Sequence, residues 1–157
     1  LEALQMIANH QIPFLGKWGD NYVVLLEMPH SHIPMGMLQM IQWLMQRNIR
    51  PLIAHPERNK DVLRRLDKIQ PLIDAGCLFQ VTAGSVAGRF GSTARERARQ
   101  LLEMGVVTVL ATDAHNIKRR PPKLDEGRDA AAVIIGAEMA QRLVVDNPWK
   151  MVSCQFE

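Results

Sequence analysis

The chain has 157 residues, of which 47% are apolar and 22% are charged, and its formal net charge is +3. This length and balance are typical of one globular domain and exclude collagen, a coiled coil or a disordered segment. Acidic and basic residues interleave along most of the chain, so the charge does not indicate nucleic-acid binding. The longest apolar run, residues 106–112, is much shorter than the ~18–20 residues of a membrane span.

The chain contains two cysteines, Cys77 and Cys154, which are too few for a disulfide framework or a thiolate metal site. We therefore expect a reducing compartment and a cytoplasmic protein. Residues 1–10 lack the basic start and apolar stretch of a secretory signal. His10 lies in this segment without a partner pattern, and we expect it to be structural or exposed.

Short β-branched runs alternate with stretches of helical periodicity, which predicts an α/β fold of parallel strands with helical crossovers. The runs end roughly 30 residues apart, the length of a strand plus a crossover helix. The predicted strands are residues 22–26, 51–54, 78–81 and 106–110. The predicted helices are residues 34–48, 62–73, 93–104, 124–136 and 137–145.

Local signals suggest how these elements begin and end. We expect Pro71 to kink the helix over residues 62–73 or to end its first part, and Ser92 or Thr93 to cap the next helix. Residues 84–88 are expected to form a glycine-containing loop, because no dinucleotide-binding or P-loop motif is present. A complete (β/α)8 barrel takes ~250 residues, so this chain is long enough for part of one.

Polar side chains follow three of the predicted strands. Glu27 follows the first, His55 the second, and Asp113 and His115 the fourth. The carboxyl ends of parallel strands meet at one edge, so we expect these four groups to cluster. Imidazole and carboxylate are ligands for Zn, Mn or Fe. Together the four residues predict a metal site.

Each of these residues also has a simpler interpretation. Glu27 suits an ordinary ion pair, His55 a hydrogen-bonded loop histidine, and residues 113–116 a turn or a helix cap. His30 and His32 form a further pair directly after Glu27. They are either accessory ligands or a loop pair at the rim of the site.

Six short segments, taken in chain order, carry a family resemblance. They are LLEMP at 25–29, AHPERN at 54–59, AGS at 83–85, GRFG at 88–91, TDAHN at 112–116 and RPP at 120–122. In this order they resemble the PHP (polymerase and histidinol phosphatase) superfamily. Within it they are similar to the manganese-dependent bacterial tyrosine-protein phosphatases of capsule and exopolysaccharide systems.

The resemblance implies a distorted (β/α)7 TIM-like barrel with a multinuclear site for Mn²⁺, with Fe or Zn as alternatives. It places Glu27, His55, Asp113 and His115 at metal-ligand positions. The family opens with an HxH strand and further His and Glu ligands, and none of these precedes Leu1 here. We therefore expect residues 1–157 to be a single, N-terminally truncated PHP domain that forms a partial barrel.

The resemblance also implies that Arg58 and Arg120 contact the substrate phosphate. A guanidinium offers a planar fork of donors that keeps its charge. Asp113 or a neighbouring histidine would handle the proton. The simpler interpretations are an ion pair from Arg58 to Glu57 or Asp61, and a solvated basic loop around Arg120.

The implied function is hydrolysis of phosphotyrosine on a protein, most specifically a tyrosine kinase of capsular or exopolysaccharide biosynthesis. Alternatives are a non-catalytic module that binds phosphate or protein, and a phosphatase for histidinol phosphate or another small monoester. Truncation would remove strands beside the Glu27 strand and about half of the ligands. We then expect weak metal binding, slow turnover and association of copies into a homo-oligomer through the open sheet edge.

Overall fold

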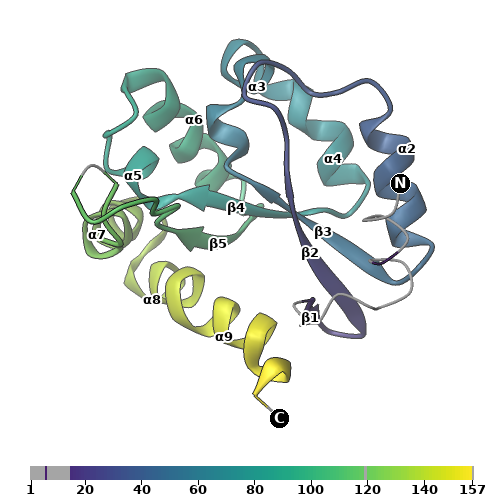
Figure 1. The fold of residues 1–157 in the computed structure, drawn as a ribbon. Coiled ribbons are helices and arrows are strands. Elements are labelled where there is room, and N and C mark those ends of the chain that lie inside the picture. The colour runs from purple at the N-terminus through teal and green to yellow at the C-terminus, as the bar shows by residue number, and fades with distance from the viewer. Residues whose placement is uncertain (1–5, 7–14, 119, 157) are drawn as a thin grey trace.

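The computed structural model describes residue 6, residues 15–118 and residues 120–156, so the expectation for His10 falls outside the described residues. Within them, one curled sheet forms a half-barrel with the strand order β1-β2-β3-β4-β5 (Figure 1). Strands β2 to β5 pair in parallel, and β1 pairs antiparallel with β2. The strands are β1 (Gly16–Trp18), β2 (Asn21–Glu27), β3 (Ile49–Ala54), β4 (Leu78–Thr82) and β5 (Val107–Ala111). The prediction of an α/β fold with parallel strands is confirmed.

The β1 strand was not predicted, because three residues are too few to show a period of two. It joins β2 through a turn in which Gly19 has a φ of 61°. Its register covers only the beginning of β2, from Trp18 beside Asn21 to Gly16 beside Val23. Further along β2, Leu25 is 62% exposed. The edge expected to be open is therefore covered over the first half of β2.

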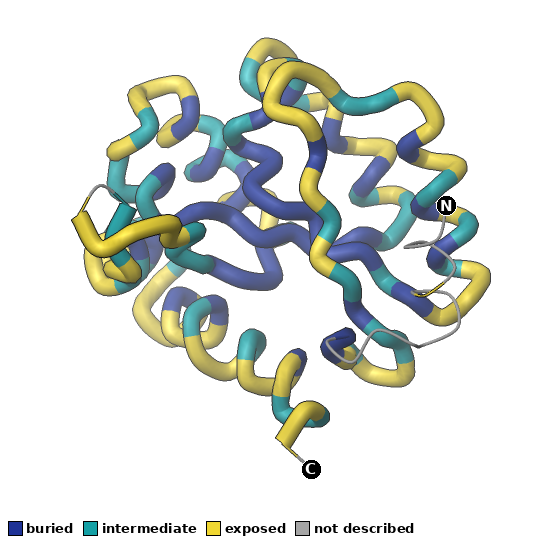
Figure 2. Tube along the Cα trace, viewed as in Figure 1, coloured by how far each residue is buried: buried dark blue, intermediate teal, exposed yellow. Residues whose placement is uncertain are grey.

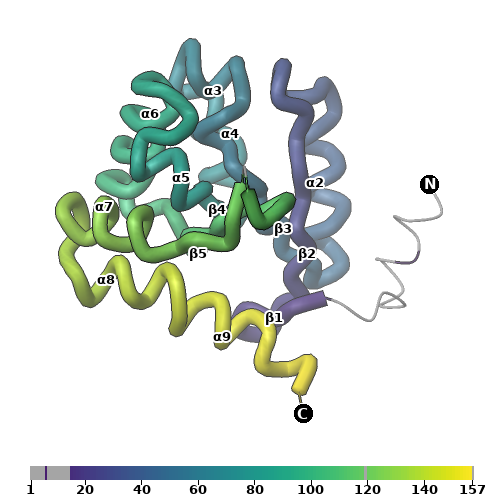
Figure 3. Tube along the Cα trace, turned by 60° about the vertical axis from the view of Figure 1, so that its left-hand side comes forward, coloured from purple at the N-terminus to yellow at the C-terminus, as the bar shows by residue number. Residues whose placement is uncertain are grey.

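Helices lie on both sides of the sheet. Figures 1 and 3 show α2, α3, α4 and α6 on one side, and α8 and α9 along the other. The helices are α2 (Met37–Met45), α3 (Lys60–Arg64), α4 (Gln70–Asp74), α5 (Ala83–Val86), α6 (Ser92–Glu103), α7 (Asp125–Ile135), α8 (Ala137–Gln141) and α9 (Asn147–Val152). Single 3₁₀ or π turns lie at Pro56–Arg58, Leu66–Ile69, Arg142–Asp146 and Ser153–Gln155.

Three local predictions were wrong. The helix expected over residues 62–73 breaks at Arg65, which has an extended backbone (φ −143°), and Pro71 lies in the first turn of α4, where its missing N–H is harmless. Residues 83–86 of the expected glycine loop form the short helix α5. The N-cap of α6 is Gly91, without a side-chain cap, so Ser92 begins the helix instead of capping it.

Apolar side chains fill the space on both faces of the sheet. The larger core lies between the strands and the outer helices and includes Ile53, Phe79 and Leu101. A smaller cluster on the inner face joins strand residues such as Val109 to Met151 of α9. Figure 2 shows the strands buried along most of their length, as expected for parallel strands covered on both faces.

No helix among the described residues has the length and apolar character needed to cross a membrane.

Candidate metal and phosphate site

The register of the sheet brings the predicted site residues to one edge. Glu27 lies beside Ala54 where β2 and β3 end, and His55 follows directly. The β5 strand ends at Ala111, two residues before Asp113. Each residue therefore leaves the sheet at its carboxyl edge, as the sequence predicted.

The backbone is strained at two of these positions. His55 has a φ of 34° and Asp113 a φ of 51°, both in the left-handed region that side chains other than glycine rarely adopt. Such conformations persist only where the surrounding structure enforces them, and they concentrate at functional sites. This strain turns each side chain away from the straight path of its strand.

His55 and Glu27 form the first pair. Nε2 of His55 lies 3.2 Å from Oε1 of Glu27, with His55 buried and Glu27 exposed. Burial lowers the pKa of His55, the Arg58 guanidinium lowers it further, and the carboxylates of Asp113 and Glu27 oppose both effects. His55 is therefore held toward its neutral form, which is the form that binds metal.

His30 joins this group from the loop after β2. Its ring stacks on that of His55, with 5.3 Å between the ring centroids and an interplanar angle of 24°. The HxH pattern had marked His30 only as a candidate. His32 is exposed, and its Nδ1 lies 2.8 Å from Oγ of the neighbouring Ser31. Of the two histidines, His30 is the one that touches a predicted site residue.

Asp113 is the centre of the second group. Its Oδ2 accepts a hydrogen bond from Nη1 of Arg58 at 2.6 Å and another from Nη2 of Arg120. Nδ1 of His115 lies 3.8 Å from Oδ1 of Asp113 and 2.9 Å from its backbone oxygen. The two arginines come from positions far apart in the sequence and meet at one carboxylate.

These contacts decide between the alternatives for the arginines. Arg58 pairs with Asp113 and not with Glu57 or Asp61. The carboxylate of Asp61 instead accepts a hydrogen bond from the backbone N–H of Ile33. Arg120 is likewise tied to Asp113, so it is not simply part of a solvated loop.

Phe90 supports both arginines and was not predicted as a site residue. The guanidinium carbon of Arg58 lies 4.4 Å from the centroid of the Phe90 ring, and that of Arg120 lies 5.7 Å away. Both distances allow a cation–π attraction. Phe90, Arg58 and His30 also line a cavity of about 220 Å³. We call Arg58, Arg120 and Phe90 the arginine clamp.

Glu57 is a buried carboxyl beneath the edge. Its Oε1 accepts hydrogen bonds from the backbone N–H of Thr82 at 3.1 Å and from Oγ of Ser85 at 2.7 Å. Its Oε2 is buried without a hydrogen-bond partner in the structure. Burial raises the pKa of Glu57 to about 6. This side chain ties the turn that carries His55 and Arg58 to the end of β4.

The donor types at the edge suit a metal such as Mn²⁺, Fe or Zn, since they are imidazole and carboxylate without thiolate. The four predicted ligands form two pairs, His55 with Glu27 and Asp113 with His115. Across the described parts of the chain, no three His, Cys, Asp or Glu side chains are grouped to hold one ion. Each pair thus offers two ligands.

The fold and this edge define an α/β half-barrel whose carboxyl edge joins imidazole–carboxylate pairs to an arginine clamp. The family model for capsular polysaccharide synthesis proteins of the CpsB/CapC type matches residues 2–153. The chain belongs to this family, which confirms the resemblance to phosphatases of capsule systems.

Relatives and a solved structure agree with this assignment. Tyrosine-protein phosphatase YwqE of Bacillus subtilis is 34% identical over 76% of this chain and 46% of its own length. Tyrosine-protein phosphatase CpsB of Streptococcus pneumoniae is 32% identical over 99% of this chain and 65% of its own. A solved structure from work on these two proteins, described as metal-dependent tyrosine phosphatases, superposes with a TM-score of 0.81 at 30% identity. It covers 95% of this chain and 59% of the solved chain.

The chain thus spans about half the length of the relatives it matches.

Proposed function

We propose that this chain carries the carboxyl-edge site of a metal-dependent protein-tyrosine phosphatase. The observation that carries the proposal is the arginine clamp, in which Arg58 and Arg120 meet at Asp113 beside the His55–Glu27 pair. The named activities of YwqE and CpsB support it. We further propose that the half-barrel belongs to a PHP-type (β/α)7 barrel, with residues 1–157 as one domain.

The chain's own groups would have distinct tasks. His55 with Glu27, and Asp113 with His115, would hold the metal, with Mn²⁺ proposed first and Fe or Zn as alternatives. A metal bound there would supply Lewis-acid chemistry by activating water and neutralising negative charge. Arg58 and Arg120 would turn from Asp113 toward the phosphate and bind its oxygens through forked N–H donors.

Asp113 would take part in proton handling as well. A carboxylate released from two guanidinium partners is free to accept a proton or to orient a water molecule. The cavity beside His30 and Phe90 would take the phenyl ring of phosphotyrosine, since aromatic side chains pack well against other rings. Its position beside Arg58 sets the ring next to the phosphate site.

The proposed substrate is a phosphotyrosine protein, specifically a bacterial tyrosine kinase of capsule or exopolysaccharide biosynthesis. This choice follows the capsule family and the named tyrosine phosphatases among the relatives. We propose a cytoplasmic location, which suits the two free thiols of Cys77 and Cys154. Self-association through the exposed part of β2 is also proposed.

The test is hydrolysis of 4-nitrophenyl phosphate and of a phosphotyrosine peptide with added Mn²⁺. We expect EDTA to abolish hydrolysis and Arg58→Ala to slow it by about 10²–10³-fold, as for loss of one transition-state donor. Arg64→Ala is the matched control, because this arginine of α3 is exposed and lies outside the clamp. Hydrolysis that survives EDTA, or that Arg58→Ala leaves unchanged, would contradict the proposal.

A second candidate is a module that binds phosphate without turnover. The grouping of the predicted ligands in twos, with no group of three in the described chain, favours it. In that case inorganic phosphate would bind in an Arg58-dependent manner, while Mn²⁺ would produce no hydrolysis above the EDTA background.

A further inference from the structure

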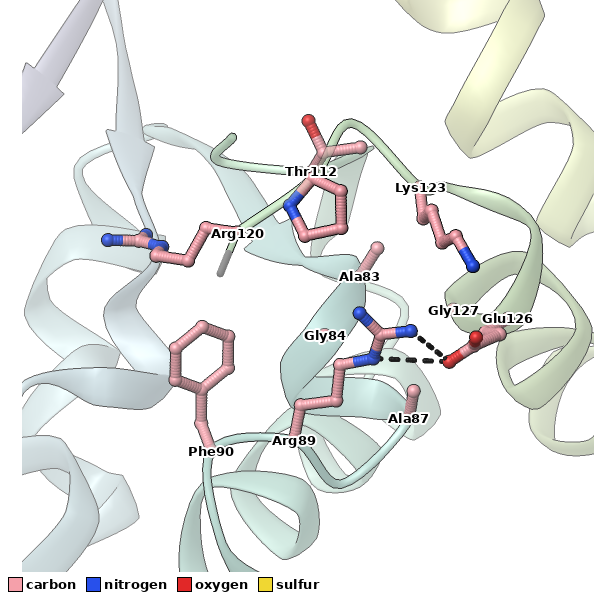
Figure 4. Close-up of a pocket in the computed structure, with 11 residues that line it drawn as sticks. Ala83, Gly84, Ala87, Arg89, Phe90, Thr112, Arg120, Lys123, Glu126 and Gly127 are labelled. Carbon is pink, nitrogen blue, oxygen red and sulfur yellow. Dashed lines mark hydrogen bonds and ion pairs between the residues drawn. The ribbon is translucent and has the colours of Figure 1, made fainter. Parts of the chain in front are cut away.

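A second cavity lies beside the arginine clamp, with a volume of about 100 Å³. Arg120 and Phe90 line it, and Phe90 also lines the cavity that holds His30 and Arg58. Phe90 therefore stands as a wall between the two cavities. Figure 4 shows the second cavity, with the guanidinium of Arg120 turned away from Arg89 and Lys123.

The floor of this cavity depends on glycine. A Cβ on Gly84 would lie 2.9 Å from Cε2 of Phe90, and a Cβ on Gly127 would lie 2.5–2.6 Å from atoms of Ala83. Both separations are too short for real contacts, so α5, α7 and the Phe90 ring approach this closely only because side chains are missing there. The cavity is thus a product of close packing between these elements.

Its rim is mostly cationic. Arg89, Arg120 and Lys123 line the cavity together with a single carboxylate, Glu126. Nη2 and Nε of Arg89 donate to Oε2 of Glu126 at 2.5 and 3.1 Å. Arg120 is engaged by Asp113. Within the described residues Lys123 forms no ion pair, and Figure 4 shows its amino end on the Arg89–Glu126 side of the cavity.

We propose that this cavity is a subsite for an acidic side chain that neighbours the phosphotyrosine of a peptide substrate; this rests on the proposed function. Water occupies about 30 Å³ per molecule, so the cavity has room for about three waters, enough for a carboxylate but not for an aromatic ring. Lys123 supplies the positive charge for that carboxylate. Arg89 is the second donor and is shared with Glu126.

The experiment compares two phosphotyrosine peptides, one with Glu on both sides of the phosphotyrosine and one with Gln at the same positions. Binding is measured by fluorescence anisotropy at low ionic strength. We expect the wild-type chain to bind the Glu peptide about three- to fivefold more tightly, as for a partly exposed charge pair. Added salt should reduce this preference.

Three variants locate the preference. Lys123→Met should erase it. Glu126→Gln frees Arg89 and should increase it. Lys150→Met, on α9, is the matched control and should leave it unchanged. Equal binding of the two peptides by the wild-type chain, or a preference that survives Lys123→Met, would overturn the subsite.

Hydrolysis of the same peptides with Mn²⁺ separates this inference from the function on which it rests. A preference that is present in binding but accompanied by no hydrolysis would reject the phosphatase and keep the acidic subsite. Hydrolysis of both peptides without any difference in affinity would reject the subsite alone.

Discussion

The core beneath the outer helices and the carboxyl edge of the sheet are built from opposite kinds of residue. The core contains side chains such as Ile53 and Phe79, which lose nothing polar when they are buried. The edge contains the strained backbone of His55 and Asp113 and the buried carboxyl of Glu57. Groups that destabilise the fold are therefore concentrated where the chemistry lies, and the core compensates for them.

The comparison implies that core substitutions change stability and leave anion binding intact. Ile53 is fully buried in β3, two residues before His55. Ile53→Ala should lower the free energy of unfolding by about 2–5 kcal/mol through lost burial and a cavity. Urea denaturation measures this change. Val133→Ala, at an exposed position of α7, is the control and should have little effect.

Phosphate affinity of the folded Ile53→Ala variant should match that of the wild-type chain. A loss of affinity as large as the loss of stability would break the proposed separation between core and edge.

The buried carboxyl at the edge should appear in the pH dependence of stability. The pKa of Glu57 is raised from 4.5 to about 6, so the folded chain binds its proton more tightly than the unfolded chain. Its contribution is most favourable below pH 4.5, and about 2 kcal/mol is lost as the pH rises to about 6. Glu57→Gln should remove this loss.

His55 acts in the opposite direction, because its lowered pKa favours folding as the pH rises. The informative quantity is therefore the difference between wild type and Glu57→Gln, measured by urea denaturation from pH 4.5 to pH 7. A difference that stays constant across this range would show that the carboxyl does not titrate in the folded chain.

Asn59 joins the edge to α3. Its Oδ1 accepts from the backbone N–H groups of Asp61 and Val62 at 3.0 and 3.4 Å, and its Nδ2 donates to the carbonyl of Pro29 at 2.9 Å. Asn59→Ala should reduce the free energy of unfolding by about 1–2 kcal/mol. Asn59→Asp keeps the cap and loses only the bond to Pro29, so it should destabilise less. Equal losses in the two variants would contradict this division.

The smallest expected effect is at Phe90. Phe90→Leu keeps an apolar side chain and removes the ring beneath Arg58 and Arg120, at about 0.5–1 kcal/mol for each contact. Phosphate affinity should fall by about three- to tenfold, with little change in the urea midpoint. An unchanged affinity would mean that Asp113 alone positions the two arginines.

The sequence was most informative where an apolar run ends at a polar residue. The β-branched runs before Glu27, His55 and Asp113 located three strand ends, because burial on both faces of a parallel sheet demands continuous apolar residues. The four-strand parallel pattern followed from these runs. The metal-ligand roles of Glu27, His55, Asp113 and His115 remain predictions, since the structure forms them as two pairs.

Other features depend on contacts between distant segments and leave no local pattern. The stacking of His30 on His55 and the position of Phe90 beneath two arginines arise only when several loops meet. The break at Arg65 was missed because the apolar stripe continues through it without interruption. The HxH pair and the arginine–phenylalanine step of GRFG were the available signals, and neither specifies a contact.

The central claim is that the carboxyl edge binds metal through its two imidazole–carboxylate pairs, and Mn²⁺ binding tests it most directly. Electron paramagnetic resonance of free Mn²⁺ should be recorded for the wild-type chain, Glu27→Gln, Asp113→Asn and the control Glu103→Gln. Glu103 is paired with Arg99 on α6, away from the edge. The account predicts at least a tenfold loss of affinity in the first two variants and none in the control. Equal Mn²⁺ affinity in all four proteins would contradict it.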